Sequence, residues 1–105
     1  MASSRLLQIV NMLKDEPHDS FLTYALALEY VKMKELNKAI EIIEGLLNRD
    51  ENYLGAYYQL GKLYEETAQT DKAIATYTKG IMIAGKQNNK KTLSELQQAI
   101  FLIEE

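Results

Sequence analysis

The stretch that decides the fold is residues 56–85, AYYQLGKLYEETAQTDKAIATYTKGIMIAG. Its first half carries apolar and small residues at intervals of three and four, the spacing of one helix face: Tyr57, Leu60, Gly61 and Tyr64. After a short polar turn, a second stripe of the same kind follows: Ala73, Tyr77 and Gly80. The two stripes predict a helical hairpin, in which the small residues Gly61 and Ala73 let the backbones approach closely. This hairpin holds no catalytic set of side chains, so we interpret it as a packing unit.

The same pattern occurs once more upstream. Four residues of the first copy precede their equivalents in the second by 34 positions: Leu26, Ala27, Tyr30 and Ala39 precede Leu60, Gly61, Tyr64 and Ala73. A fixed period of this length marks a helical solenoid. Together with the L-G-x-x-Y and A-x-x-x-Y signatures, it resembles the tetratricopeptide repeat, whose members are mostly scaffolds that bind other proteins. The resemblance is close over residues 20–85 and looser on both flanks.

Composition agrees with an all-α chain. With 105 residues the chain has the length of a single domain, and its 47% hydrophobic content is enough to bury a core. One proline and five glycines leave few helix breakers. The predicted fold is therefore an all-α superhelix, a solenoid of antiparallel helix pairs with about six helices.

The repeat period divides the chain into four segments. Residues 1–17 are expected to form an N-terminal half-repeat helix that Ser3 or Ser4 caps and that stops before Pro17. Residues 20–52 form repeat one and residues 54–86 form repeat two. Residues 92–105 form a C-terminal capping helix, displaced by two residues from the repeat register. Asp71 is the expected N-cap of the second helix of repeat two, and Gly85 its left-handed end.

Several classes of function have no support in the residues. A net charge of −3 argues against a phosphate-tracking surface, so no nucleic-acid partner is expected. Cysteine is absent and His18 is the only histidine, so we expect no metal site, no cofactor and no enzymatic activity. No run of 18 apolar residues is present, so a membrane partner is not expected either, and we take a soluble cytoplasmic protein as the default.

The resemblance implies where a partner would bind. In the family the first helix of each repeat lines the concave side, and its ligand positions correspond here to Phe21, Tyr24, Leu28 and Val31 in repeat one and to Tyr58, Gln59, Lys62 and Glu65 in repeat two. The spacing of Tyr24, Leu28 and Val31 supports this, because they recur on a face turned away from Leu26 and Tyr30. We expect an apolar patch, rimmed by charges that include Lys32 and Glu66, that accepts a peptide or helix of a partner protein.

Three alternatives remain at this stage. The first helix or the C-terminal helix of the same chain could fold over the patch, the residues could belong to the core, or the patch could join two copies in a homodimer. Some relatives grip the acidic tail of a heat-shock chaperone with lysine and asparagine side chains. This chain has Tyr24, Leu28 and Gln59 at three of those positions, so that clamp is largely missing.

Overall fold

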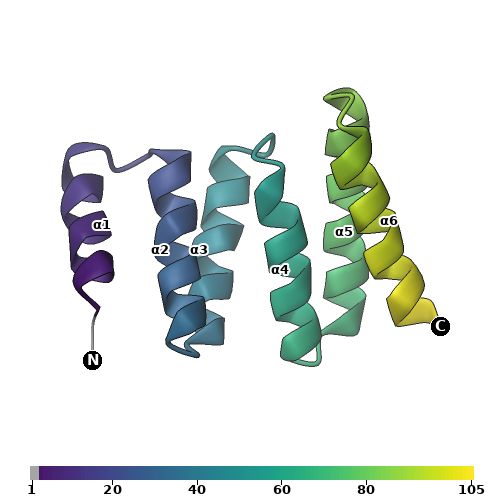
Figure 1. Ribbon diagram of the computed structural model, residues 1–105, viewed down its shortest axis with the longest axis horizontal. Helices are drawn as coiled ribbons and strands as arrows, with labels where there is room; N and C mark the ends of the chain where they lie inside the picture. Colours follow the sequence, from purple (N-terminus) through teal and green to yellow (C-terminus); the bar gives the residue numbers. More distant parts are fainter. Residues whose placement is uncertain (1–2) are drawn as a thin grey trace. The chain divides into compact units, whose positions relative to one another are not determined.

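The computed structural model describes residues 3–105, which form six helices and no strand. In chain order they are α1 (Ser4–Asp15), α2 (Ser20–Lys32), α3 (Leu36–Arg49), α4 (Gly55–Glu66), α5 (Thr70–Lys86) and α6 (Lys90–Glu104) (Figure 1). The all-α class and the six helices agree with the prediction. The helices group into two compact units, one ending at Asp50 and the other running from Glu51 to Glu105.

In the first unit, α2 packs against α3 on one side and against α1 on the other. Side chains cap two of these helices, because Ser3 Oγ accepts a hydrogen bond from Leu6 N at 2.9 Å and Asp19 Oδ1 accepts one from Leu22 N at 2.8 Å. The buried apolar residues come from all three helices: Leu6, Ile9, Ala25, Ala27, Ala39, Ile40, Ile43 and Leu46. Of the stripe predicted for α2, Ala27 is buried, whereas Leu26 and Tyr30 are only half-buried.

Hydrogen bonds join the start of α2 to the end of α3. Ser20 Oγ donates to Asp50 Oδ2 at 2.6 Å, and Arg49 Nη2 donates to Thr23 Oγ1 at 3.1 Å. Thr23 Oγ1 itself donates to the carbonyl of Asp19 at 2.8 Å, so this buried hydroxyl has partners on both helices. These bonds fix the hairpin at the end opposite to its turn.

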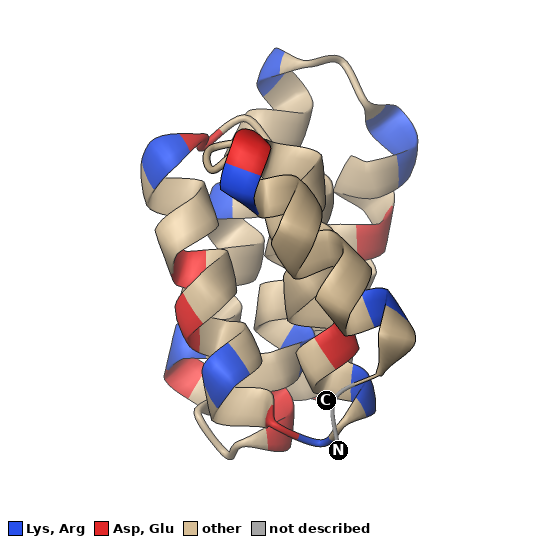
Figure 2. Cartoon of the chain, turned by 90° about the vertical axis from the view of Figure 1, so that its left-hand side faces the viewer, with Lys and Arg blue, Asp and Glu red and all other residues tan. Residues whose placement is uncertain are grey.

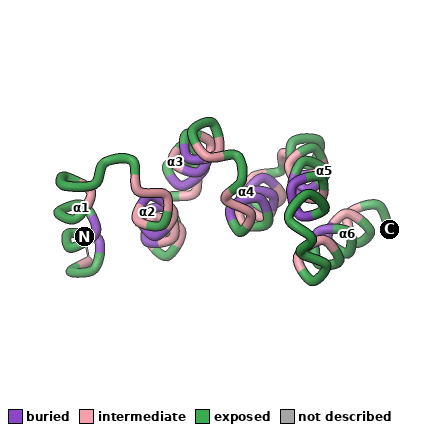
Figure 3. Tube along the Cα trace, turned by 90° about the horizontal axis from the view of Figure 1, so that it is seen from above, coloured by how far each residue is buried: buried purple, intermediate pink, exposed green. Residues whose placement is uncertain are grey.

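In the second unit, α5 is the central helix and contacts both α4 and α6. Figure 3 shows buried positions on the sides of these three helices that face one another. The ring of Tyr77 lies against Gly61 in the space that a Cβ atom would need. At Gly80, an added Cβ would lie 2.8 Å from Tyr57 Cβ and 2.9 Å from Leu96 Cδ1. The predicted role of small residues in close helix packing is therefore confirmed at Gly61.

Three predicted helix limits differ from the structure. Asp71 lies in the first turn of α5 and the N-cap is Gln69. Gly85 lies within α5 and has no positive φ, because the helix continues to Lys86 and the left-handed residue is Asn88, with φ 56°. The last helix also begins at Lys90, two residues before the expected start, since the Asn89 side chain caps it by accepting from Thr92 N at 3.0 Å.

Candidate partner-binding surfaces

In the first unit, a small hollow lies beside the exposed face of α2. Its volume is about 180 Å³, and its lining comes from α1 and α2: Arg5, Phe21, Tyr24, Ala25, Leu28, Glu29 and Lys32. Three of the four predicted residues of repeat one therefore meet here. Phe21 is 66% exposed, while Tyr24 and Leu28 are half-buried. Val31, also half-buried, does not line the hollow.

The first helix borders this hollow without filling it. Leu6 and Ile9 of α1 are buried, whereas Arg5 contributes to the wall of the hollow. Among the alternatives from the sequence, closure of the patch by α1 is thus only partial. The exposed ring of Phe21 and the remaining space leave apolar surface for another segment.

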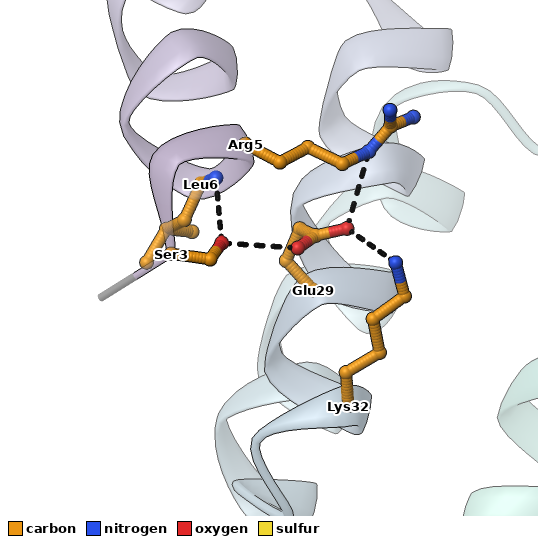
Figure 4. Close-up of polar contacts among 5 residues, drawn as sticks. All are labelled: Ser3, Arg5, Leu6, Glu29 and Lys32. Carbon is orange, nitrogen blue, oxygen red and sulfur yellow. Dashed lines mark hydrogen bonds and ion pairs between the residues drawn. The ribbon is translucent and has the colours of Figure 1, made fainter. Parts of the chain in front are cut away.

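One wall of the hollow is a charged cluster around Glu29, whose side chain is only 6% exposed (Figure 4). Glu29 Oε2 lies 3.0 Å from Lys32 Nζ and 3.2 Å from Arg5 Nε, and Oε1 accepts a hydrogen bond from Ser3 Oγ at 3.2 Å. The hydrogen bond from Lys32 is the main cause of a lowered pKa of Glu29, with help from Ser3 and Arg5, and burial opposes it. A buried carboxylate therefore stays ionised and holds two cations in place.

In the second unit, a groove of about 280 Å³ lies between α4 and α6. Its lining residues are Tyr58, Lys62 and Glu65 from α4 and Glu95, Gln98, Ala99 and Leu102 from α6. Three of the four predicted residues of repeat two are thus brought together. Gln59 is half-buried and is not among the lining residues.

Contacts within α4 and α5 hold the groove's polar side chains in position. Lys62 Nζ lies 5.7 Å from the centre of the Tyr58 ring and 3.9 Å from Glu65 Oε2. Glu65 also accepts a hydrogen bond from the hydroxyl of Tyr77. Burial, and then this bond, raise the pKa of Tyr77 far above its ordinary value, so the phenol remains a donor to Glu65. The groove therefore presents an aromatic ring beside a cation and a carboxylate of fixed orientation.

The sequence offered the first and last helices only as possible covers of the patch, and it did not identify Arg5 or any residue of α6 as lining a binding surface. The two-residue displacement of the last helix was a usable signal, because it moves Glu95, Gln98 and Leu102 to ligand positions of a repeat. For Arg5 the only signal was charge, since Glu29 lies among apolar residues of α2 and needs a cationic partner. The sequence did not show that α1 would supply it.

Within residues 3–105, no group of three or more histidine, cysteine, aspartate or glutamate side chains could hold a metal ion. No helix in that part of the chain is long and apolar enough to cross a bilayer. Figure 2 shows acidic and basic positions scattered among uncharged ones along the helices.

Comparison with known proteins identifies the two repeats that the sequence period predicts. A family model described as tetratricopeptide repeat matches residues 23–53 and 54–87. The crystal structure of a tetratricopeptide repeat domain protein from Salinibacter ruber is similar with 45% identity and a TM-score of 0.77, covering 82% of this chain and 96% of that one. No curated protein matches the chain.

Two further solved structures share the fold at 19% identity. A protein from Bordetella parapertussis matches with a TM-score of 0.84, and the matched region covers 97% of this chain and 89% of the Bordetella chain. The TPR2B domain of yeast Sti1, solved in complex with pHsp70, also matches with a TM-score of 0.84. The matched region covers 91% of this chain and 77% of the Sti1 chain. At this identity the likeness concerns the fold alone.

Proposed function

Because this chain belongs to the tetratricopeptide repeat family, we propose that it is a non-catalytic protein-interaction module that docks a peptide or helix of a partner protein. The binding surfaces in this proposal are the exposed face of α2 and the groove between α4 and α6. The observation that carries it is the groove, where Tyr58, Lys62 and Glu65 lie together beside α6. The Sti1 neighbour, solved with a bound partner, supports docking on this fold in general terms.

The proposed mechanism divides the work between apolar and charged residues. Apolar contact comes from Phe21, Tyr24, Leu28 and Val31 on α2 and from Tyr58 on α4. Gln59, Lys62 and Glu65 orient the partner through hydrogen bonds and charge. Aromatic residues carry much of the binding energy at protein interfaces, so the tyrosines are the main anchors. We do not propose a chaperone tail as the partner, because Tyr24, Leu28 and Gln59 replace clamp residues.

This function is tested by selecting binders from a random 12-residue peptide library displayed on phage, with the purified chain as the target. We expect selected peptides to bind Tyr58→Ala or Tyr24→Ala more weakly by about 1–3 kcal/mol, with unchanged helical circular dichroism. Met82→Ala is the matched control, because Met82 is an exposed apolar residue of α5 outside the groove. Absence of any selected peptide, or equal losses in the control, would contradict the proposal.

A second candidate function is structural self-association as a homodimer without any other ligand. It is favoured by exposed apolar side chains near the end of α6, since Leu102, which lines the groove, and the neighbouring Phe101 are each 66% exposed. Sedimentation equilibrium distinguishes this function from partner docking.

A further inference from the structure

The lining of the hollow in the first unit combines apolar side chains with an excess of positive charge. We propose that it binds a segment of the partner in which an aspartate or glutamate lies beside an apolar side chain. In this arrangement the apolar side chain enters the hollow and the carboxylate pairs with Arg5 and Lys32. The inference rests on the proposed docking function and names the chemistry of the partner at this surface.

The excess of positive charge arises because Glu29 is the single carboxylate paired with two cationic side chains. One carboxylate is shared by two cations, and both bind the same oxygen, Oε2. The other oxygen is occupied by the hydroxyl of Ser3. The cluster therefore carries one net positive charge that no acidic side chain lining the hollow balances. A negatively charged partner removes this excess, whereas a cationic one is repelled.

Both cations remain available to a ligand. The side chains of Arg5 and Lys32 are 64% and 68% exposed. Arg5 uses its Nε atom for Glu29, and Figure 4 shows its two terminal nitrogens turned away from that carboxylate. These nitrogens form a planar fork that matches a carboxylate with two parallel hydrogen bonds. Glu29 acts here as a positioning residue that fixes the fork at the edge of the hollow.

The apolar part of the hollow has room for one large side chain. Its apolar lining comes from Phe21, Tyr24, Ala25 and Leu28. An apolar cavity of about 150 Å³ is large enough to hold benzene. A hollow of about 180 Å³ is therefore suited to a single phenylalanine or leucine side chain. Because Arg5 and Lys32 line the same hollow, the paired acidic residue must lie within a few positions of this apolar anchor in the partner sequence.

The test uses the peptides selected from the displayed library, in which no random residue has a free terminal carboxylate. We expect a class of peptides that contains aspartate or glutamate within about one helical turn of phenylalanine, leucine or another apolar residue. Made as soluble amidated peptides, they should bind Arg5→Gln and Lys32→Gln about tenfold more weakly, the effect of one charge-assisted hydrogen bond. Phe21→Ala should weaken the same peptides, and raising the salt concentration should reduce their affinity.

Lys38→Gln is the matched control, because Lys38 is an exposed lysine of the same unit that does not line the hollow. Thermal unfolding of every variant separates lost binding from lost folding. Selected peptides without acidic residues, or acidic peptides that bind Arg5→Gln and Lys38→Gln equally, would overturn the inference. If the selected peptides in either of these cases bind Tyr58→Ala more weakly than the wild type, the docking function stands and only the assignment of the hollow fails. If no peptide is selected, both proposals fail.

Discussion

At the scale of single residues, Glu29 makes the stability of the first unit depend on pH. Its pKa is lowered in the folded chain, chiefly by the hydrogen bond from Lys32, so ionised Glu29 stabilises the fold at neutral pH. This contribution is lost as the pH falls below the ordinary value of 4.5 and through the lowered one. We expect Glu29→Gln to be less stable than the wild type at pH 7 and to lose less stability on acidification.

The measurement is the free energy of urea unfolding between pH 3 and pH 7. Glu41→Gln serves as the control, since Glu41 is an exposed glutamate on α3. The control should follow the wild-type pH dependence. If Glu29→Gln and wild type lose stability in parallel down to pH 3, the Glu29 cluster does not stabilise the fold.

Two glycines provide a second prediction at this scale. Gly61→Ala places a methyl group against the buried ring of Tyr77, and that ring has no free space because Tyr77 is fully buried. We expect the free energy of unfolding to fall by about 1–3 kcal/mol. Gly45→Ala, in α3, meets nothing within 4 Å and should raise stability by up to about 1 kcal/mol. Thermal unfolding of both variants measures the contrast, and equal effects would show that Tyr77 does not pack on Gly61.

At the scale of elements, the turns between paired helices share one backbone geometry that the sequence did not reveal. Lys34, Ala68 and Asn88 have φ values of 63°, 60° and 56°. At each turn the amide of the next residue bonds back to a carbonyl five positions earlier: Glu35 to Tyr30, Gln69 to Tyr64 and Asn89 to Ala84. This is a helix C-cap in which glycine is the usual residue. Because no glycine marks the position, sequence reasoning assigned the left-handed end to Gly85.

The strain at this position is open to test. Ala68 is a non-glycine residue in the left-handed region, which costs about 1 kcal/mol or more. We expect Ala68→Gly to raise the free energy of unfolding by about 0.5–1 kcal/mol after the entropy of the unfolded chain is counted. Ala75→Gly, at an exposed site inside α5, should lower it by about 1 kcal/mol. A loss of stability in both variants would contradict the left-handed geometry at Ala68.

At the scale of the whole molecule, the repeat pattern accounts for how much could be predicted. The 34-residue period and the stripe through Tyr57, Leu60 and Gly61 identify the helices because burial follows the helical period directly. The binding surfaces were predicted less fully. Tyr24 and Tyr58 could be placed from repeat positions, but Arg5 and Leu102 come from helices outside the two full repeats. The contacts of these two residues depend on how α1 packs on α2 and how α6 lies beside α4, which periodicity within one helix does not encode.

The oligomeric state decides whether the α2 face binds a partner protein or a second copy of the chain. If the α2 face is free to bind a partner, sedimentation equilibrium of the purified chain should give a single species of 12.0 kDa across micromolar concentrations. A mass that doubles with concentration and returns to 12.0 kDa in Leu28→Glu would place a second copy on that face. Asn37→Glu adds the same charge at an exposed site on α3 and controls for general repulsion. In that case self-association would replace docking as the function of the α2 face, because the apolar contacts that a partner needs would already be used.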